Sequence, residues 1–264
     1  HAAEAMTGFA TSVIGCGVEA GIDHELSSED TPDGRPGISV LMFSMSGKEL
    51  EKQLEKRVGQ CVLTSPSSAI FSGMNGDKTI NLGKNLRFFG DGYQISKLIG
   101  GRRYWRVPVM DGEFIAEEVT GYSSAVGGGN FLVLATSQEQ ALAACELAID
   151  AMQDIPNVIM PFPGGVVRSG SKIGSRYKTL PASTNHVFCP TLKGLTQSQL
   201  SSDIESVMEI VVNGMNDDDI RKAMRAGMNA VCALGADNGI KRISAGNYGG
   251  ELGKFHFHLQ EIMA

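Results

Sequence analysis

Apolar and polar residues along the chain repeat one order three times, a short apolar run followed by a stretch with apolar residues at every third or fourth position. The short runs are residues 38–44, residues 130–135 and the stretch around Glu209. Apolar residues three or four apart share one face of a helix, whereas a short apolar run is typical of a buried strand. The pattern therefore predicts three strand-then-helix units.

Each predicted helix begins at a residue that favours the N-cap position. Ser46 is followed three residues later by Glu49, and Ser137 by Gln140, which is the spacing of a capping box, while the third helix begins at Asn216. The apolar stripes of the three helices are, in chain order, Leu50, Leu54, Val58 and Cys61; Leu142, Cys145, Ile149 and Met152; and Ile220, Met224, Met228 and Val231. We expect these stripes to pack against the strands.

Turn signals between the helices predict antiparallel hairpins. Gly100-Gly101 and Asp111-Gly112 each separate two runs rich in strand-forming residues, and residues 255–259 alternate as Phe-His-Phe-His-Leu, which predicts a further strand. A few helices with many antiparallel hairpins favour an α+β sandwich, with the helices on one face of each sheet.

The three similar units indicate an internal duplication whose first member is cut short. Residues 1–8 have the composition of a helix that ends at Gly8, so the chain begins inside an element, as a fragment or a processed product does. We expect two tightly packed lobes, residues 1–125 and 126–264, because no change in composition marks a linker between them.

Glu209 stands in the middle of a run that is apolar on both faces. Its own face of the strand also carries Val207 and Val211, and the opposite face is apolar throughout. Such a strand is typically covered on both sides, where a carboxyl group must find partners or take up a proton. A protonated Glu in a dry site is a proton donor for catalysis. The structural alternative is a Glu at a sheet edge, or one paired with a buried Arg.

Composition narrows the class of protein. A net charge of -6 and a pI near 5.4 disfavour a nucleic-acid binder, which needs a basic face. The five cysteines are widely spaced and include no C-x-x-C, which indicates reduced thiols in a cytoplasmic protein. No apolar run reaches membrane-spanning length, and no signal peptide is visible.

Three loops are candidates for ligand binding. Residues 31–37 form a rigid turn that carries Asp33 and Arg35, although a plain surface turn has the same composition. Gly127-Gly128-Gly129-Asn130 lacks the pattern of a nucleotide site but indicates close approach of the backbone to another group. The stiff loop at residues 161–165 is followed by two hydroxyls and a cation that suit an anionic or polyhydroxyl ligand, Ser169, Ser171 and Lys172.

A metal site is not predicted. His256 and His258 share one face of the predicted C-terminal strand, but no third ligand lies at a convincing spacing. The chain also lacks the G-x-S-x-G and H-E-x-x-H motifs. Composition and spacing alone therefore indicate a soluble α+β protein with a carboxyl group in a buried strand.

Several runs, taken together and in order, resemble one family over essentially the whole chain. They are Thr7-Gly-Phe-Ala-Thr-Ser-Val-Ile, Thr31-Pro-Asp-Gly-Arg-Pro-Gly, Gly59-Gln-Cys-Val-Leu-Thr, Phe89-Gly-Asp-Gly-Tyr, Gly128-Gly-Asn-Phe, Pro161-Phe-Pro-Gly-Gly, Pro181-Ala-Ser-Thr-Asn, Glu209-Ile-Val-Val-Asn-Gly and Ser244-Ala-Gly-Asn-Tyr-Gly-Gly-Glu-Leu-Gly. The chain resembles the formylmethanofuran:tetrahydromethanopterin formyltransferase family, but lacks that family's first strand and most of its first helix. The resemblance implies two ferredoxin-like lobes and a homotetramer.

The resemblance also implies a reaction, transfer of a formyl group between the amine of formylmethanofuran and N5 of tetrahydromethanopterin in methanogens or methylotrophic bacteria. The two coenzymes are co-substrates, and no tightly bound cofactor or metal is expected because acyl transfer needs proximity, proton transfer and oxyanion stabilisation. The family's catalytic glutamate corresponds to Glu209, which we expect to be protonated. We expect the polyanionic coenzyme tails to contact Asp33, Arg35, Asn130, Ser169, Ser171, Lys172 and Asn247.

Two alternatives stay open. One is the transferase subunit of a formyltransferase/hydrolase complex, in which a metal-dependent partner subunit releases formate. The other is a relative without catalytic activity that binds a pterin or organises a complex.

Overall fold

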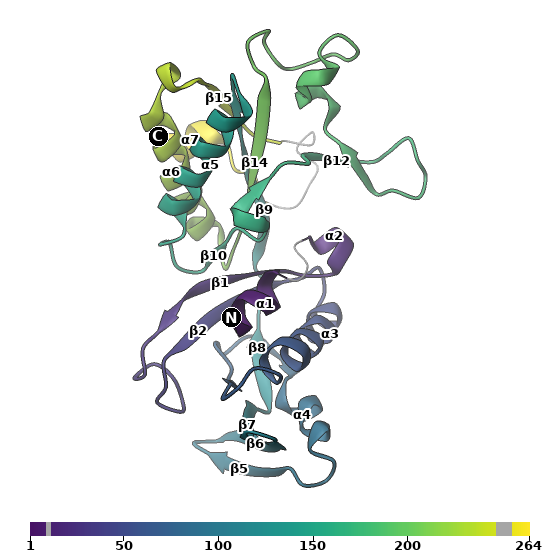
Figure 1. Ribbon diagram of the computed structural model, residues 1–264, viewed down its shortest axis with the longest axis vertical. Coiled ribbons are helices and arrows are strands. Elements are labelled where there is room, and N and C mark those ends of the chain that lie inside the picture. The colour runs from purple at the N-terminus through teal and green to yellow at the C-terminus, as the bar shows by residue number, and fades with distance from the viewer. Residues whose placement is uncertain (9–11, 247–254) are drawn as a thin grey trace. The chain divides into compact units, whose positions relative to one another are not determined.

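The computed structural model describes residues 1–8, 12–246 and 255–264 (Figure 1). The chain forms two compact units, His1–Ala125 and Val126–Ala264. Each unit has its own apolar core.

The unit Val126–Ala264 has the strand and helix order of a ferredoxin-like fold. Its main elements are β9 (Val126–Ala135), α5 (Gln138–Met152), β10 (Val158–Ile159), β14 (Ser206–Gly214), α6 (Asp217–Leu234) and β15 (Ile240–Ser244). The sheet order is β10-β14-β9-β15, all neighbours are antiparallel, and β11 (Val166–Val167) also pairs with β14. The two central strands, β9 and β14, each lead into a helix, which is the β-α-β-β-α-β arrangement.

Side-chain caps fix where the two helices of this unit begin. The Ser137 hydroxyl accepts a hydrogen bond from the Gln140 N–H at 3.2 Å, and Asn216 Oδ1 accepts one from the Asp219 N–H at 2.9 Å. Each bond satisfies a backbone donor that the helix itself leaves unpaired. Gly235 ends α6 with a φ of 72°, which a glycine adopts without steric cost. The sequence predicts both helix starts.

Both helices cover the same face of the sheet, as Figure 1 shows. The buried face of α6 carries Ile220, Met224, Met228 and Val231, as predicted. The stripe predicted for α5 is wrong at Leu142, which is 40% exposed. Three alanines, Ala141, Ala144 and Ala148, are buried there instead. Small side chains allow close packing against α6 and the sheet. A stripe defined only by large apolar residues does not include these alanines.

The opposite face of the same sheet has a second, smaller apolar cluster. It contains Leu132, Leu134 and Ile204, with Phe188, Leu200 and Val207 packed against it. Short turns of 3₁₀ helix at His186–Phe188 and Pro190–Leu192 belong to the segment that covers this face. The central strands are therefore buried on both sides, as the apolar run around Glu209 predicts.

The C-terminal residues differ from the prediction. Residues 255–258 have no regular structure, and α7 (Leu259–Met263) follows, so the alternating pattern at 255–259 does not form a strand. Ile262 is 1% exposed in the core of this unit, and the Arg225 guanidinium donates to its carbonyl oxygen. Leu259 and Ile262, three residues apart, share the apolar face of a helical turn, which overrides the short alternation.

The unit His1–Ala125 is rich in hairpins. Its elements are α1 (Ala2–Gly8), α2 (Val13–Cys16), β1 (Glu19–Leu26), β2 (Gly37–Phe43), α3 (Gly47–Arg57), a π-helical turn (Val58–Val62), β3 (Ala69–Ile70), β4 (Lys78–Asn81), α4 (Gly83–Leu86), a 3₁₀ turn (Arg87–Gly90), β5 (Ile95–Ile99), β6 (Arg102–Val109), β7 (Gly112–Glu117) and β8 (Val119–Tyr122). β1 pairs with β2 and β4 with β8, while a third sheet has the order β3-β7-β6-β5. All these pairs are antiparallel except β3 with β7.

Several local predictions for this unit are confirmed. The hairpins at Gly100-Gly101 and Asp111-Gly112 join β5 to β6 and β6 to β7. Ser46 caps α3 by accepting the Glu49 N–H at 3.2 Å. Leu54 and Val58 are buried in the core of the unit, with Leu50 and Cys61 packed partly buried against it.

Candidate active site

Glu209 occupies the middle of β14 and is 6% exposed. In the register of the sheet it lies opposite Val167 of β11 and Leu132 of β9, and Leu132 in turn lies opposite Ser244 of β15. Directly opposed residues of antiparallel strands share one face of a sheet. The carboxyl group therefore lies on the face away from α5 and α6, between apolar neighbours on both flanking strands.

The Asn130 side chain contacts this carboxyl group directly. Its Nδ2 donates to Glu209 Oε1 at 2.8 Å, and its Oδ1 accepts the backbone N–H of Gly246 at 3.1 Å. Only the amide oxygen can accept from a backbone N–H, so the bond to Gly246 fixes which end of the amide faces Glu209. Oε1 is consequently an acceptor, and Oε2 is the oxygen that carries a proton when the group is neutral.

The environment of Glu209 favours the neutral acid. Burial raises its pKa above the ordinary value for Glu, and the hydrogen bond from Asn130 opposes this rise. Among the described residues no Lys, Arg or His makes an ion pair with Glu209. A buried Arg partner, the structural alternative for this residue, is therefore absent from the described part of the chain.

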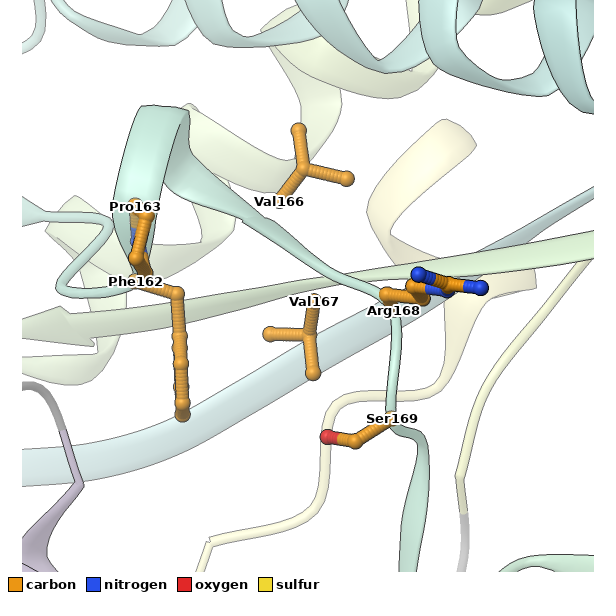
Figure 2. A pocket seen from close by; sticks show the side chains of 6 residues that line it. All are labelled: Phe162, Pro163, Val166, Val167, Arg168 and Ser169. Atoms are coloured by element: carbon orange, nitrogen blue, oxygen red, sulfur yellow. The ribbon is translucent and has the colours of Figure 1, made fainter.

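An open depression of about 550 Å³ lies beside this position in the same unit. Its lining residues are Phe162, Pro163, Val166, Val167, Arg168 and Ser169 (Figure 2). Val167 is both a lining residue and the neighbour of Glu209 on β11. Figure 2 shows the Val167 side chain and the Ser169 hydroxyl on the opposite side of the segment from Val166. The loop predicted at residues 161–165 thus leads from this depression to the strand beside Glu209.

The glycine run before Asn130 serves packing within the unit. A Cβ on Gly129 would lie 2.7 Å from Ile220 Cγ2, so α6 approaches β9 closely at that point. Gly128 has a φ of 85°, and its N–H donates to Asn213 Oδ1 at 2.8 Å. Asn213 is fully buried and anchors the start of the strand that presents Asn130. Sequence reasoning did not select Asn213, although a polar residue in a buried strand is a signal for such a role.

The other predicted binding residues are divided between the two units. Ser169 lines the depression, and Ser171 and Lys172 lie on β12 (Ser171–Ile173), which pairs with β13 (Ala182–Thr184). Asp33 and Arg35 belong to the other unit, where they form an ion pair with a 2.6 Å separation. The Arg35 guanidinium also donates to the Ser67 carbonyl, which joins the turn at residues 31–37 to the segment around Ser67.

Two candidates remain, Asn247 for coenzyme binding and the pair His256 and His258 for a metal. Asn247 lies outside the residues that the structure describes. The rings of His256 and His258 stack with centroids 6.3 Å apart, and no group of three or more His, Cys, Asp or Glu residues suited to a metal occurs within the described ranges. Within those ranges, too, no helix has both the length and the apolar character needed to cross a bilayer.

The family of the chain follows from comparison with known proteins. The sequence model described as formylmethanofuran-tetrahydromethanopterin formyltransferase matches residues 1–109, and the one described as the proximal lobe of the same protein matches residues 112–262. The chain belongs to this formyltransferase family. The resemblance seen in the sequence motifs is thereby confirmed.

Individual relatives of this formyltransferase chain agree with the assignment. The formylmethanofuran–tetrahydromethanopterin formyltransferase of Methylococcus capsulatus is 72% identical over 264 residues, covering 100% of this chain and 89% of the relative. A crystal structure of the formyltransferase/hydrolase complex of Methylorubrum extorquens with methylofuran contains a chain with a TM-score of 0.96 and 49% identity, covering 100% of this chain and 87% of the other. The Methanosarcina barkeri formyltransferase gives a TM-score of 0.91 and 46% identity, covering 99% of this chain and 88% of the other. These structures confirm the predicted fold class.

Proposed function

We propose that the chain transfers a formyl group between formylmethanofuran and tetrahydromethanopterin, and that Glu209 is the proton donor of the reaction. Membership of the family supports the reaction. One observation carries the role of Glu209: a buried carboxyl group with a raised pKa whose Oε1 accepts from Asn130 and whose Oε2 is left to carry a proton.

In this account the pterin amine attacks the formyl carbon, and the carbonyl oxygen gains negative charge as the tetrahedral intermediate forms. The Oε2–H of Glu209 stabilises that oxygen by a hydrogen bond and then gives its proton to the leaving nitrogen of the furan coenzyme. The attacking amine loses one proton, which returns to Oε2, so Glu209 ends the cycle protonated. Proton transfer by a positioned group contributes about 10²–10⁴ in rate.

The chemistry itself requires only placement of the two co-substrates, proton transfer and stabilisation of the oxyanion. We infer on that ground that methanofuran and tetrahydromethanopterin suffice as coenzymes, with no tightly bound cofactor. We further propose a cytoplasmic homo-oligomer, a tetramer as the family resemblance implies, without nucleic-acid or membrane partners.

The experiment compares the purified protein with its Glu209→Gln variant in an assay that follows the N5-formyl product by absorbance. Gln keeps the shape and an oxygen acceptor for Asn130 but cannot donate an acidic proton, so we expect a loss of about 10²–10⁴ in rate. Exposed Glu146→Gln on α5 is the matched control and should retain full rate. A Glu209→Gln variant with near-normal rate removes Glu209 from the mechanism, and pterin binding without activity in the unmodified protein favours the non-catalytic alternative.

A second candidate function is the transferase subunit of a formyltransferase/hydrolase complex. The similar chain from Methylorubrum extorquens is part of such a complex, which supports this possibility. The test is to assay the isolated chain for both products. Formylated pterin without free formate is expected of the transferase alone, and formate release only after a hydrolase partner is added supports the complex.

A further inference from the structure

Charge is distributed unevenly along the unit that carries Glu209. Between Asp154 and Asp203 the sequence contains no Asp or Glu but includes Arg168, Lys172, Arg176, Lys178 and Lys193. The other 18 of the chain's 23 Lys and Arg residues share the remaining sequence with all 29 Asp and Glu residues. Residues 155–202 of this acidic protein therefore carry basic side chains and no acidic ones.

Four of these cations, Arg168, Lys172, Arg176 and Lys178, lie within eleven consecutive residues and are called the basic strip below. None of them makes an ion pair within residues 1–8, 12–246 and 255–264. Lys193, by contrast, pairs with Glu205 at 2.9 Å. Arg168, Arg176 and Lys178 are exposed and Lys172 is half-buried, so their charges are available to a ligand.

A hydrogen-bonded hairpin carries the basic strip. Arg168 precedes its first strand, Lys172 lies on that strand, and Arg176 and Lys178 lie in the loop between the two strands. The strands β12 and β13 pair, the Asn185 N–H donates to the Gly170 carbonyl at 3.0 Å, and the Gly174 N–H donates to the Pro181 carbonyl at 2.8 Å. The Ser183 hydroxyl adds a bond to the Gly174 carbonyl at 2.7 Å. In Figure 1 this arm, labelled at β12, extends to the right of β9 and β14. The cations are thus held on an ordered support.

The strip begins next to the proposed reaction centre. Arg168 directly follows Val167, the neighbour of Glu209 on β11, and it lines the open depression at the end opposite Phe162 (Figure 2). The remaining cations follow along the arm. A ligand whose reactive end reaches Glu209 through the depression would have the rest of its length beside these charges.

We infer that the basic strip binds an extended, multiply anionic tail of one of the two co-substrates while the reactive end of that co-substrate reaches Glu209. Several unpaired cations without interspersed acids attract carboxylates or phosphates and raise the encounter rate of such ligands. The inference rests on the proposed function for the identity of the ligand, but the strip's affinity for polyanions is measurable without any turnover. Net charge -6 for the chain disfavours a nucleic acid as the occupant.

The test uses a strip variant with Arg168, Lys172, Arg176 and Lys178 changed to Gln. The control variant carries the same change in charge at four exposed cations of the other unit that also lack ion pairs among the described residues, Lys48, Lys78, Lys84 and Lys97. Calorimetry measures binding of tetraglutamate, a polycarboxylate, and of tripolyphosphate at low and high salt. Steady-state assays then give kcat and KM for each co-substrate, and circular dichroism checks folding.

We expect the strip variant to bind its preferred probe on the order of 10- to 100-fold more weakly at low salt, since exposed ion pairs contribute little individually but four act together. The KM for one co-substrate should rise with kcat nearly unchanged, and preference for tetraglutamate or tripolyphosphate distinguishes a carboxylate tail from a phosphate. Equal binding and equal KM in the strip and control variants would overturn the inference. If the fourfold variant does not fold, the exposed pair Arg176→Gln with Lys178→Gln is measured instead, against Lys84→Gln with Lys97→Gln.

Probe binding tests the anion site on the basic strip, and turnover tests the proposed formyl transfer, so the two claims can fail independently. Probe binding that depends on the strip, together with absent formyl transfer, contradicts the proposed function and leaves the anion site standing. Normal formyl transfer with KM values unaffected by the strip contradicts the anion site and leaves the proposed function standing.

Discussion

Asn130 and Glu209 lie on neighbouring strands with Asn130 Nδ2 2.8 Å from Glu209 Oε1, and the two residues are 79 positions apart in the sequence. The backbone N–H of Gly246 holds the Asn130 amide in the orientation that presents its donor to the carboxyl group. One strand therefore supplies the acid and the next determines which of its oxygens is free to donate.

Replacing Asn130 by Ala should change both the rate and its pH dependence. The hydrogen bond from Asn130 lowers the pKa of Glu209 against the larger effect of burial, so its loss raises that pKa further. Because the protonated acid is the active form, we expect the alkaline fall in rate to move to higher pH. The rate at neutral pH should drop about 10-fold through lost orientation, from the worth of one hydrogen bond. The measurement is kcat as a function of pH.

The matched control for Asn130 is Asn85, whose amide donates to the exposed carboxyl group of Glu55 at 3.1 Å. Asn85→Ala should leave the pH profile unchanged. A profile for Asn130→Ala that moves to lower pH, or not at all, contradicts the account of the hydrogen bond.

Glu209→Gln should make the protein more stable than the parent at alkaline pH. Burial raises the pKa of Glu209 in the folded state above its value in the unfolded chain. The stabilisation from the neutral acid is complete below the unfolded pKa and is lost as pH rises through the folded pKa, because the unfolded chain then releases the proton more readily. Gln has no proton to release, so the difference in free energy of unfolding between the variant and the parent protein should grow with pH and vanish in acid. Urea unfolding across pH measures it, and equal pH dependence in both proteins would rule out a buried neutral acid.

Gly129→Ala tests the packing role of the glycine run. The added Cβ would lie 2.7 Å from Ile220 Cγ2 on α6, so the helix or the strand must shift. Overpacking of this kind typically destabilises a protein by about 1–3 kcal/mol. Gly194→Ala is the control, since its added Cβ would meet nothing within 4 Å. Thermal or urea unfolding compares the two, and a Gly129→Ala variant as stable as Gly194→Ala would contradict close packing as the reason for glycine here.

Local features of the fold were predictable because they depend on neighbouring residues. The caps at Ser137 and Asn216 each bond to a backbone N–H three residues ahead, and the Gly235 stop requires only the conformational freedom of glycine. The predictions for Leu142 and for residues 255–259 were wrong because these features depend on contacts with distant parts of the chain. Which face of α5 is buried, and whether the C-terminal residues extend or turn, depends on what α6 and the sheet present to them.

The site was predictable in part. Glu209 stood out because a carboxyl group interrupts an apolar strand. Asn130, expected from the sequence to contact a coenzyme, donates a hydrogen bond to Glu209, and this partnership depends on the register of β9 against β14. The basic strip was not predicted, because the sequence motif grouped Lys172 with nearby hydroxyls and not with the other cations of its segment. Absence of acids over a long segment is nevertheless a sequence-level signal.

Infrared difference spectroscopy tests the central claim most directly. Spectra of the parent protein minus Glu209→Gln at neutral pH, with and without ¹³C-labelled glutamate, report whether the Glu209 carboxyl group is protonated. The account predicts a carbonyl band of a protonated acid that shifts with the label and disappears as pH is raised. Carboxylate bands in its place at neutral pH would show that Glu209 is ionised and would contradict its role as proton donor.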